Sequence, residues 1–186
     1  MKTSTTSLII ILLLSLSTIG FGQNHFLVEL PKRTPDVATM VRSYEGTAVI
    51  PVMANDINGK EQFIGNYKGD NLILYFWKIG NPRSVELLNY LNLLKQKYTD
   101  LNIVSFALDS KEDLISFTQS FEVDFPIIPN AEILSEGPYG GELGMPKLFF
   151  IDDKGITKWV FPAQELNSTS MDISNILSIL HEQETH

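Results

Sequence analysis

The sequence predicts an α/β sandwich, in which a mixed β-sheet has helices on both faces. Residues 72–77 form a continuous apolar run, as expected of a strand buried on both faces, and residues 103–108 are expected to form the next buried strand. A helix-forming stretch follows each run, and this alternation predicts parallel strands joined by helical crossovers. Further along, residues 147–152 and 156–161 flank Asp153-Lys154-Gly155 and predict an antiparallel hairpin.

An N-terminal β-hairpin is expected ahead of this sheet. Apolar residues between Val49 and Met53 are followed by Asn58-Gly59, and Asn-Gly is a strong signal for a hairpin turn. Residues 24–46 instead mix prolines and charged residues with short apolar pieces. We expect an irregular or lightly structured lead-in there.

The first helix of the sandwich is expected over residues 82–98. Leu87, Leu91, Leu94 and Tyr98 recur at helical spacing and form one apolar stripe. Its start has two strong signals, because Asn is among the best N-cap residues and Pro is favoured at the first helical position. These signals are Asn81 and Pro82.

The remaining elements are shorter. The pattern predicts a helix over residues 112–121, a short strand over 125–128 and a glycine-rich loop over 130–145. Thr169–Asp172 has a capping-box pattern and is expected to open a closing helix. The apolar face of that helix would be formed by Ile173, Ile176, Leu177 and Leu180.

Composition is that of a globular protein. The chain has 186 residues, of which 44% are hydrophobic and 19% charged, and its net charge is −8. This length suits one domain and a processing segment. Nucleic acid is a poor partner for so acidic a chain, because phosphate contacts need clustered Lys and Arg.

The N-terminus predicts an export signal. Lys2 supplies the positive end, Leu8–Leu14 is an apolar run, and Gly20-Phe21-Gly22 offers small residues for cleavage. The run is well short of the roughly 20 residues of a membrane span, so no stable span is expected after cleavage. We expect an exported protein, periplasmic or secreted, from a bacterial envelope.

Four segments follow from these patterns. They are a signal peptide (1–22), a lead-in (23–46), one folded domain (47–182) and a polar tail (183–186). Disulfides would be allowed in an oxidising compartment, yet the chain contains no cysteine. Its stability is therefore expected to come from the core.

Four local signatures, in this order, resemble the thioredoxin-like superfamily, and above all its exported TlpA/ResA-type and AhpC/TSA redoxin-like domains. The region Asp56–Trp77 resembles the family's lead-in to its first core strand. Phe76-Trp77 resembles the strand end before the family's Cys-x-x-Cys, and Asn81–Ser84 stands in the place of that motif. Residues 139–146 resemble the loop that carries the family's cis-proline, and 149–155 the hairpin after it. The resemblance covers residues 45–182.

The resemblance implies a thioredoxin-like α/β/α sandwich with a mixed central sheet and an N-terminal β-hairpin extension. It also implies a cis peptide at Met145–Pro146, beside the first turn of the helix that begins at Pro82. Thiol chemistry, however, needs a sulfur with a lowered pKa, and the degenerate motif Asn81, Pro82, Arg83 and Ser84 has none. The chain is therefore expected to lack thiol-disulfide and peroxidase activity.

Other chemistries find little support. Ser84 as a hydrolytic nucleophile would need a nearby base, whereas His25, His181 and His186 all lie near the termini. The last two histidines are five residues apart and would not share a helical face as zinc ligands do. We expect no cofactor and no metal. Ser84 would sit at the third helical position, where its hydroxyl can bond nearby backbone.

Three functions remain open. The leading one is a non-catalytic module that binds a protein or peptide in a groove at Trp77, Met145 and Pro146, where the family pairs its backbone with an extended segment. The alternative is membership of, or assistance to, the thiol-disulfide oxidoreductase system of cell redox homeostasis. The second alternative is an anion or small-ligand binder at the first helix N-terminus, with Arg83.

Overall fold

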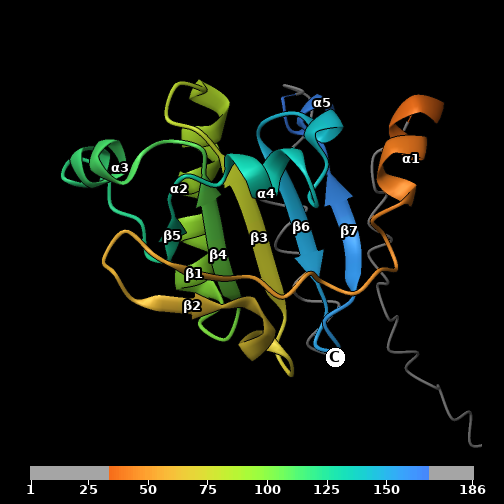
Figure 1. Cartoon of the computed structure of the whole chain (residues 1–186), viewed down its shortest axis with the longest axis horizontal. Helices are drawn as coiled ribbons and strands as arrows, with labels where there is room; N and C mark the ends of the chain where they lie inside the picture. The colour runs from red at the N-terminus through yellow and green to blue at the C-terminus, as the bar shows by residue number, and fades with distance from the viewer. Residues whose placement is uncertain (1–33, 168–186) are drawn as a thin grey trace, which may run out of the picture.

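The computed structural model describes residues 34–167, which contain a five-stranded mixed sheet (Figure 1). The strand order is β5-β4-β3-β6-β7. Strands β3, β4 and β5 are parallel, whereas β6 runs antiparallel to both of its neighbours, β3 and β7. The predicted mixed sheet is confirmed. Its strands are β3 (Leu72–Trp77), β4 (Asn102–Ala107), β5 (Ile127–Ile128), β6 (Lys147–Ile151) and β7 (Thr157–Phe161).

Strand β3 is the centre of the core, and all of its side chains are buried. Because side chains alternate along a strand, β3 feeds both faces of the sheet. Ile73, Tyr75 and Trp77 enter one apolar cluster. The other cluster receives Leu72, Leu74 and Phe76. This two-sided burial explains why the run is continuously apolar.

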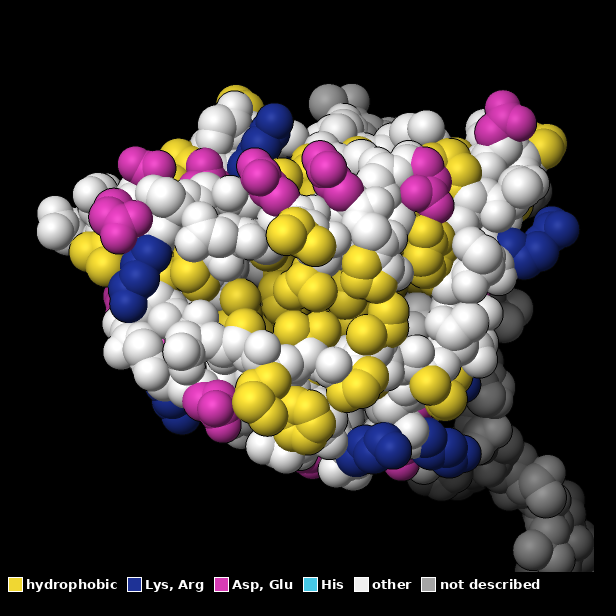
Figure 2. All heavy atoms as spheres, in the orientation of Figure 1, with side chains coloured by type: hydrophobic (Ala, Val, Ile, Leu, Met, Phe, Trp, Pro, Cys, Tyr) yellow, Lys and Arg dark blue, Asp and Glu magenta, His cyan; other side chains and the backbone are white. Residues whose placement is uncertain are grey.

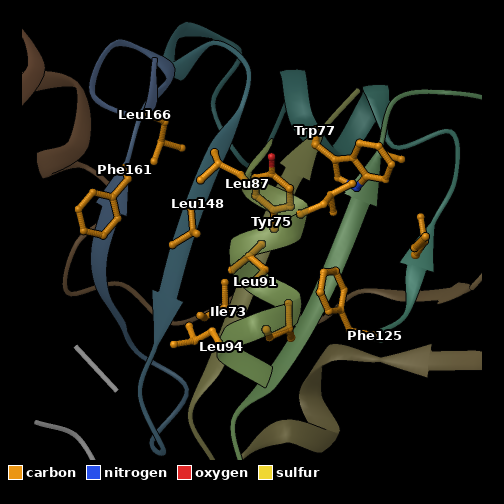
Figure 3. Close-up of a cluster of buried hydrophobic side chains, with 14 of the residues drawn as sticks. Ile73, Tyr75, Trp77, Leu87, Leu91, Leu94, Phe125, Leu148, Phe161 and Leu166 are labelled. Carbon is orange, nitrogen blue, oxygen red and sulfur yellow. The ribbon is translucent and has the colours of Figure 1, made fainter. Parts of the chain in front are cut away.

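Helices α2 (Pro82–Lys97) and α3 (Lys111–Thr118) cover one face of the sheet. Figure 3 shows Leu87, Leu91 and Leu94 of α2 directed at the sheet, among the side chains of β3 and Leu148 of β6. These leucines form the stripe that the sequence predicts. Helix α3 adds Leu114, which has no exposed area.

The opposite face is covered by shorter elements, some of which were not predicted. They are α1 (Pro35–Arg42), η1 (Ile64–Tyr67), α4 (Glu132–Glu136) and η2 (Gly141–Leu143). The expectation of an irregular lead-in is wrong over α1, where Thr34 is the N-cap and Pro35 the first helical residue. The expectation of a loop over 130–145 is wrong over α4 and η2.

Residues 46–57, which we call the strap, cross this second face and protect both edges of the sheet (Figure 1). At one end the Gly46 N–H donates to Thr157 O at 2.7 Å, and the Thr157 N–H donates to Thr47 O at 2.8 Å. At the other end the Ile57 N–H donates to Ile127 O at 2.9 Å. An unpaired edge invites pairing with another chain, so the strap limits such pairing along β5 and β7.

The expected N-terminal hairpin is present at the end of the strap. Strand β1 (Met53–Asn55) pairs antiparallel with β2 (Glu61–Phe63), and Gly59 in the turn has φ of 81°. The buried Asp56 carboxylate organises this turn, because it accepts the N–H groups of Asn58 and Lys60, both at 2.9 Å. The hairpin is therefore confirmed, with shorter strands and a longer turn than the Asn-Gly pair alone indicates.

The end of the described chain holds one more short helix, α5 (Ala163–Leu166), which the sequence pattern did not indicate. The signal peptide, the closing helix from Thr169, the domain end at 182 and the polar tail lie outside the described residues. Between residues 34 and 167 there is no helix of the length and apolarity that crossing a membrane requires.

Candidate functional site

The start of α2 is capped by Asn81, as the sequence predicts. Its side-chain Oδ1 accepts the N–H groups of Arg83 at 3.0 Å and Ser84 at 3.2 Å. Pro82 has no N–H to satisfy, and the Val85 N–H donates to Asn81 O at 3.3 Å. The first turn of the helix therefore has no unused N–H group.

The Met145–Pro146 loop lies directly against this helix start. The peptide between the two residues is cis, as the resemblance implied. The Asn81 Nδ2 donates to Met145 O at 3.2 Å. Since Oδ1 already accepts two N–H groups, the orientation of the amide is determined by its partners. Asn81 thus joins the helix to the loop.

The anion-binding alternative finds several of its donor groups already engaged at this place. The Arg83 Nε donates to Leu166 O at 2.6 Å, and its Nη1 pairs with Glu86 Oε2 at 2.6 Å. The hydrogen bond from Arg83 lowers the pKa of the Glu86 carboxyl. With the helix N–H groups occupied by Asn81 and the guanidinium occupied by α5 and Glu86, the geometry weighs against an anion here.

Ser84 lies in the first turn of α2, three residues after Asn81, and it is fully buried. Its Oγ has no hydrogen-bond partner among the described residues, so the expectation that the hydroxyl bonds nearby backbone is wrong. The carbonyl of Ser84, by contrast, accepts the Tyr75 hydroxyl at 2.8 Å. A hydroxyl without solvent access or a base cannot act as a nucleophile.

Trp77 is also buried completely, so its proposed place in the lining of a surface groove is a wrong prediction. The last residue of β3 points toward the α2 face, where the indole packs against Phe117 of α3 with ring centroids 5.6 Å apart. Of the other two groove residues, Met145 is half-buried and Pro146 is buried. The accessible part of the site is therefore Met145, with exposed Pro82 and half-buried Asn81 beside it.

Lys147 follows the cis-proline and was missed by the sequence reasoning. Its side chain is fully buried, and Nζ donates to Ser135 O at 2.7 Å and to Gly140 O at 2.6 Å. Burial lowers the pKa of Lys147 to about 8, against an opposing effect of Glu142 and Glu136. The amine ties α4, through Ser135, and the residue before η2, Gly140, to the first residue of β6. A lone lysine at the start of the apolar run 147–151 was the available signal.

The buried hydroxyl of Ser84 yields a stability prediction. Ser84→Ala is expected to leave the free energy of unfolding unchanged or raise it by about 1 kcal/mol, because the hydroxyl is desolvated without a partner. The matched control is Ser105→Ala, which removes a buried hydroxyl that donates to Pro126 O at 3.2 Å and should cost about 1 kcal/mol. Urea unfolding of both variants measures the difference. Equal losses would contradict the assignment.

Lys147 yields a pH prediction. Its pKa of about 8 in the folded state lies below the ordinary 10.5, so between these values the unfolded state binds more protons. By linkage, its contribution to the free energy of unfolding rises as the pH increases through that interval. Urea unfolding of the wild type and Lys147→Met at several pH values isolates this contribution from that of the tyrosines. A parallel pH dependence in the two proteins would contradict the prediction.

Comparisons with known proteins identify the fold. No family model matches the chain. It is 25% identical over 158 residues to the thiol-disulfide oxidoreductase ResA of Bacillus thuringiensis, across 79% of this chain and 81% of that protein.

Similar solved structures also have this fold. A thiol:disulfide interchange protein of the thioredoxin family from Chlorobium tepidum superposes with a TM-score of 0.63 at 15% identity, covering 76% of this chain and 98% of that one. A secreted disulfide oxidoreductase of Mycobacterium tuberculosis, homologous to E. coli DsbE, gives 0.60 at 17% identity, covering 72% and 96%. The chain therefore has a thioredoxin-like fold, and the proteins it resembles are thiol-disulfide oxidoreductases of the ResA and DsbE type.

Proposed function

We propose that this protein binds an extended polypeptide at the Met145–Pro146 loop and carries out no thiol chemistry itself. The observation that carries the proposal is the state of the Met145 backbone. Within residues 34–167 no oxygen accepts the Met145 N–H, although this residue lies only two positions before the first residue of β6 and is half-buried. An unpaired backbone donor at the end of a strand is the element that an added strand uses.

The proposed binding site is at this loop because the outer edges of the sheet are less accessible to an added strand. The strap engages the outer edges of β5 and β7 at Ile127 and Thr157, which leaves less room for strand addition there. The Met145 loop is instead placed beside the start of α2 by Asn81. Backbone pairing at this loop would supply affinity, and the half-buried Met145 side chain would contribute an apolar contact.

The charge around the loop favours a basic partner. Figure 2 shows carboxylates, with a basic side chain among them, along the upper edge of the molecule, above apolar side chains on the strap face. The neighbouring segments contribute three exposed acids, Glu132 and Glu136 of α4 and Glu142 of η2. The positive charge of Lys147 is buried beneath them. Complementary charge favours the encounter with a cationic segment.

The chain lacks the cysteine sulfurs that direct catalysis of thiol-disulfide exchange requires. Asn81 and Ser84 stand where the relatives' chemistry needs two sulfurs, and the chain has no cysteine elsewhere. The similarity to ResA supports a second candidate, an accessory role beside an active thiol-disulfide oxidoreductase. The predicted signal at 1–22, and the secreted relative from M. tuberculosis, support placing either role in the cell envelope.

A thiol-exchange assay separates binding from catalysis. The purified protein is expected to show no reduction of insulin, whereas Asn81→Cys/Ser84→Cys should gain turnover, since a thiol at a helix start has a lowered pKa. The matched control is Leu93→Cys/Gln96→Cys, an exposed pair at the same spacing on the same helix. That pair should be slower by about tenfold, as expected from one unit of thiol pKa. Turnover by the unmodified chain would overturn the proposal.

Site-specific photocrosslinking tests the binding surface. Benzoylphenylalanine at Met145 is expected to capture a defined polypeptide in the native host, while the same group at Leu93, which is 62% exposed, should not. An excess of an unfolded cationic polypeptide should suppress the crosslink at Met145. Equal capture at both positions, or capture at Leu93 alone, would contradict the proposed site.

A further inference from the structure

We propose that the side chain of Asn81 competes with the partner for the Met145 carbonyl, so that the binding site is half-occupied by the protein itself. This inference rests on the proposed function and concerns the regulation of the same site. An extended segment that pairs fully with a residue uses both its N–H and its C=O. The N–H of Met145 is available to a partner, whereas its C=O already accepts a hydrogen bond from Asn81 Nδ2 at 3.2 Å.

The helix cap keeps this competitor in place. The planar amide of Asn81 directs Oδ1 toward the N–H groups of Arg83 and Ser84, at 3.0 and 3.2 Å, and Nδ2 toward Met145 O. Rotating Nδ2 away from the carbonyl would also displace Oδ1 from the helix start. A partner N–H that approaches the Met145 carbonyl on the lone pair that Asn81 uses therefore competes with capping of α2, and Asn81 couples the two.

A second amide lies near the same carbonyl. Asn167 Nδ2 is 3.5 Å from Met145 O, which is long for a hydrogen bond, and Asn167 is exposed and caps no helix start. The Asn167 side chain can move away from the Met145 carbonyl without the loss of a helix cap. Asn81 is therefore the residue that sets the availability of the carbonyl, and Asn167 provides a matched control.

Two substitutions separate the roles of the Asn81 amide. Asn81→Ser and Asn81→Thr retain a capping oxygen for α2 but carry no amide that reaches Met145 O. Both should release the carbonyl while the helix start is preserved. Affinity for an extended polypeptide is then expected to rise about fivefold, the value of one net hydrogen bond. Asn167→Ser should change the affinity by less than about twofold.

The experiment uses the full chain, labelled with ¹⁵N, and the probe is hen lysozyme that has been reduced and carboxamidomethylated, an unfolded cationic polypeptide. The shift of the Met145 N–H resonance on titration reports both the site and the Kd. Thermal unfolding of each variant confirms that it is folded, and Asn81→Thr replaces Asn81→Ser if the latter is not.

The outcomes are distinct. Tighter binding by the capped variants, with a Met145 shift in every protein, supports the inference. A Met145 shift with unchanged or weaker binding by these variants overturns the competition and leaves the proposed function intact. The absence of a Met145 shift in the wild type and all variants overturns the proposed function, and the competition with it.

Discussion

The amide of Asn81 is the interaction on which the site depends. Its oxygen accepts hydrogen bonds from two N–H groups at the start of α2 that would otherwise have no partner within the helix. Its nitrogen donates a hydrogen bond to the Met145 carbonyl in the cis-proline loop. The following Arg83 then fastens the same turn to α5 through Leu166 O. Three segments far apart in sequence are thereby held together by two neighbouring side chains, without a covalent link.

This arrangement explains how the fold is maintained in a chain without cysteine. The core is built on both sides of β3, and none of its apolar contacts involves a cysteine. Asn81 provides a better helix cap than a cysteine would at the same position. Ser84 fills its buried place with a hydroxyl that has no partner among the described residues. The Asn81 side chain therefore adds hydrogen bonds to this turn, whereas the Ser84 hydroxyl adds none among those residues.

The parts of the fold that follow from local periodicity were predictable. The range of β3 matches the apolar run Leu72–Trp77, and α2 begins at Pro82 as its capping signal indicates. Helix α1 was missed because prolines and charges were given more weight than the Thr34-Pro35 start signal. Helix α4 has five residues within a glycine-rich segment, too few for a helical period to be recognised.

The site was predictable in position but not in detail. The resemblance placed Asn81 beside the Met145 loop, yet which side chains are exposed depends on packing that no local pattern contains. Trp77 is covered by α3, and Lys147 is buried because two carbonyls, Ser135 O and Gly140 O, converge on its amine. Both outcomes arise from contacts between distant parts of the chain.

The most direct test of the account is a crystal structure of the protein with the polypeptide that crosslinks at Met145. We expect an extended segment beside residues 144–146, with a carbonyl of the segment at hydrogen-bond distance from the Met145 N–H and an α2 start that is still capped. A segment seated elsewhere, such as on the strap face, or a Met145 N–H that is bonded within the protein, would contradict it.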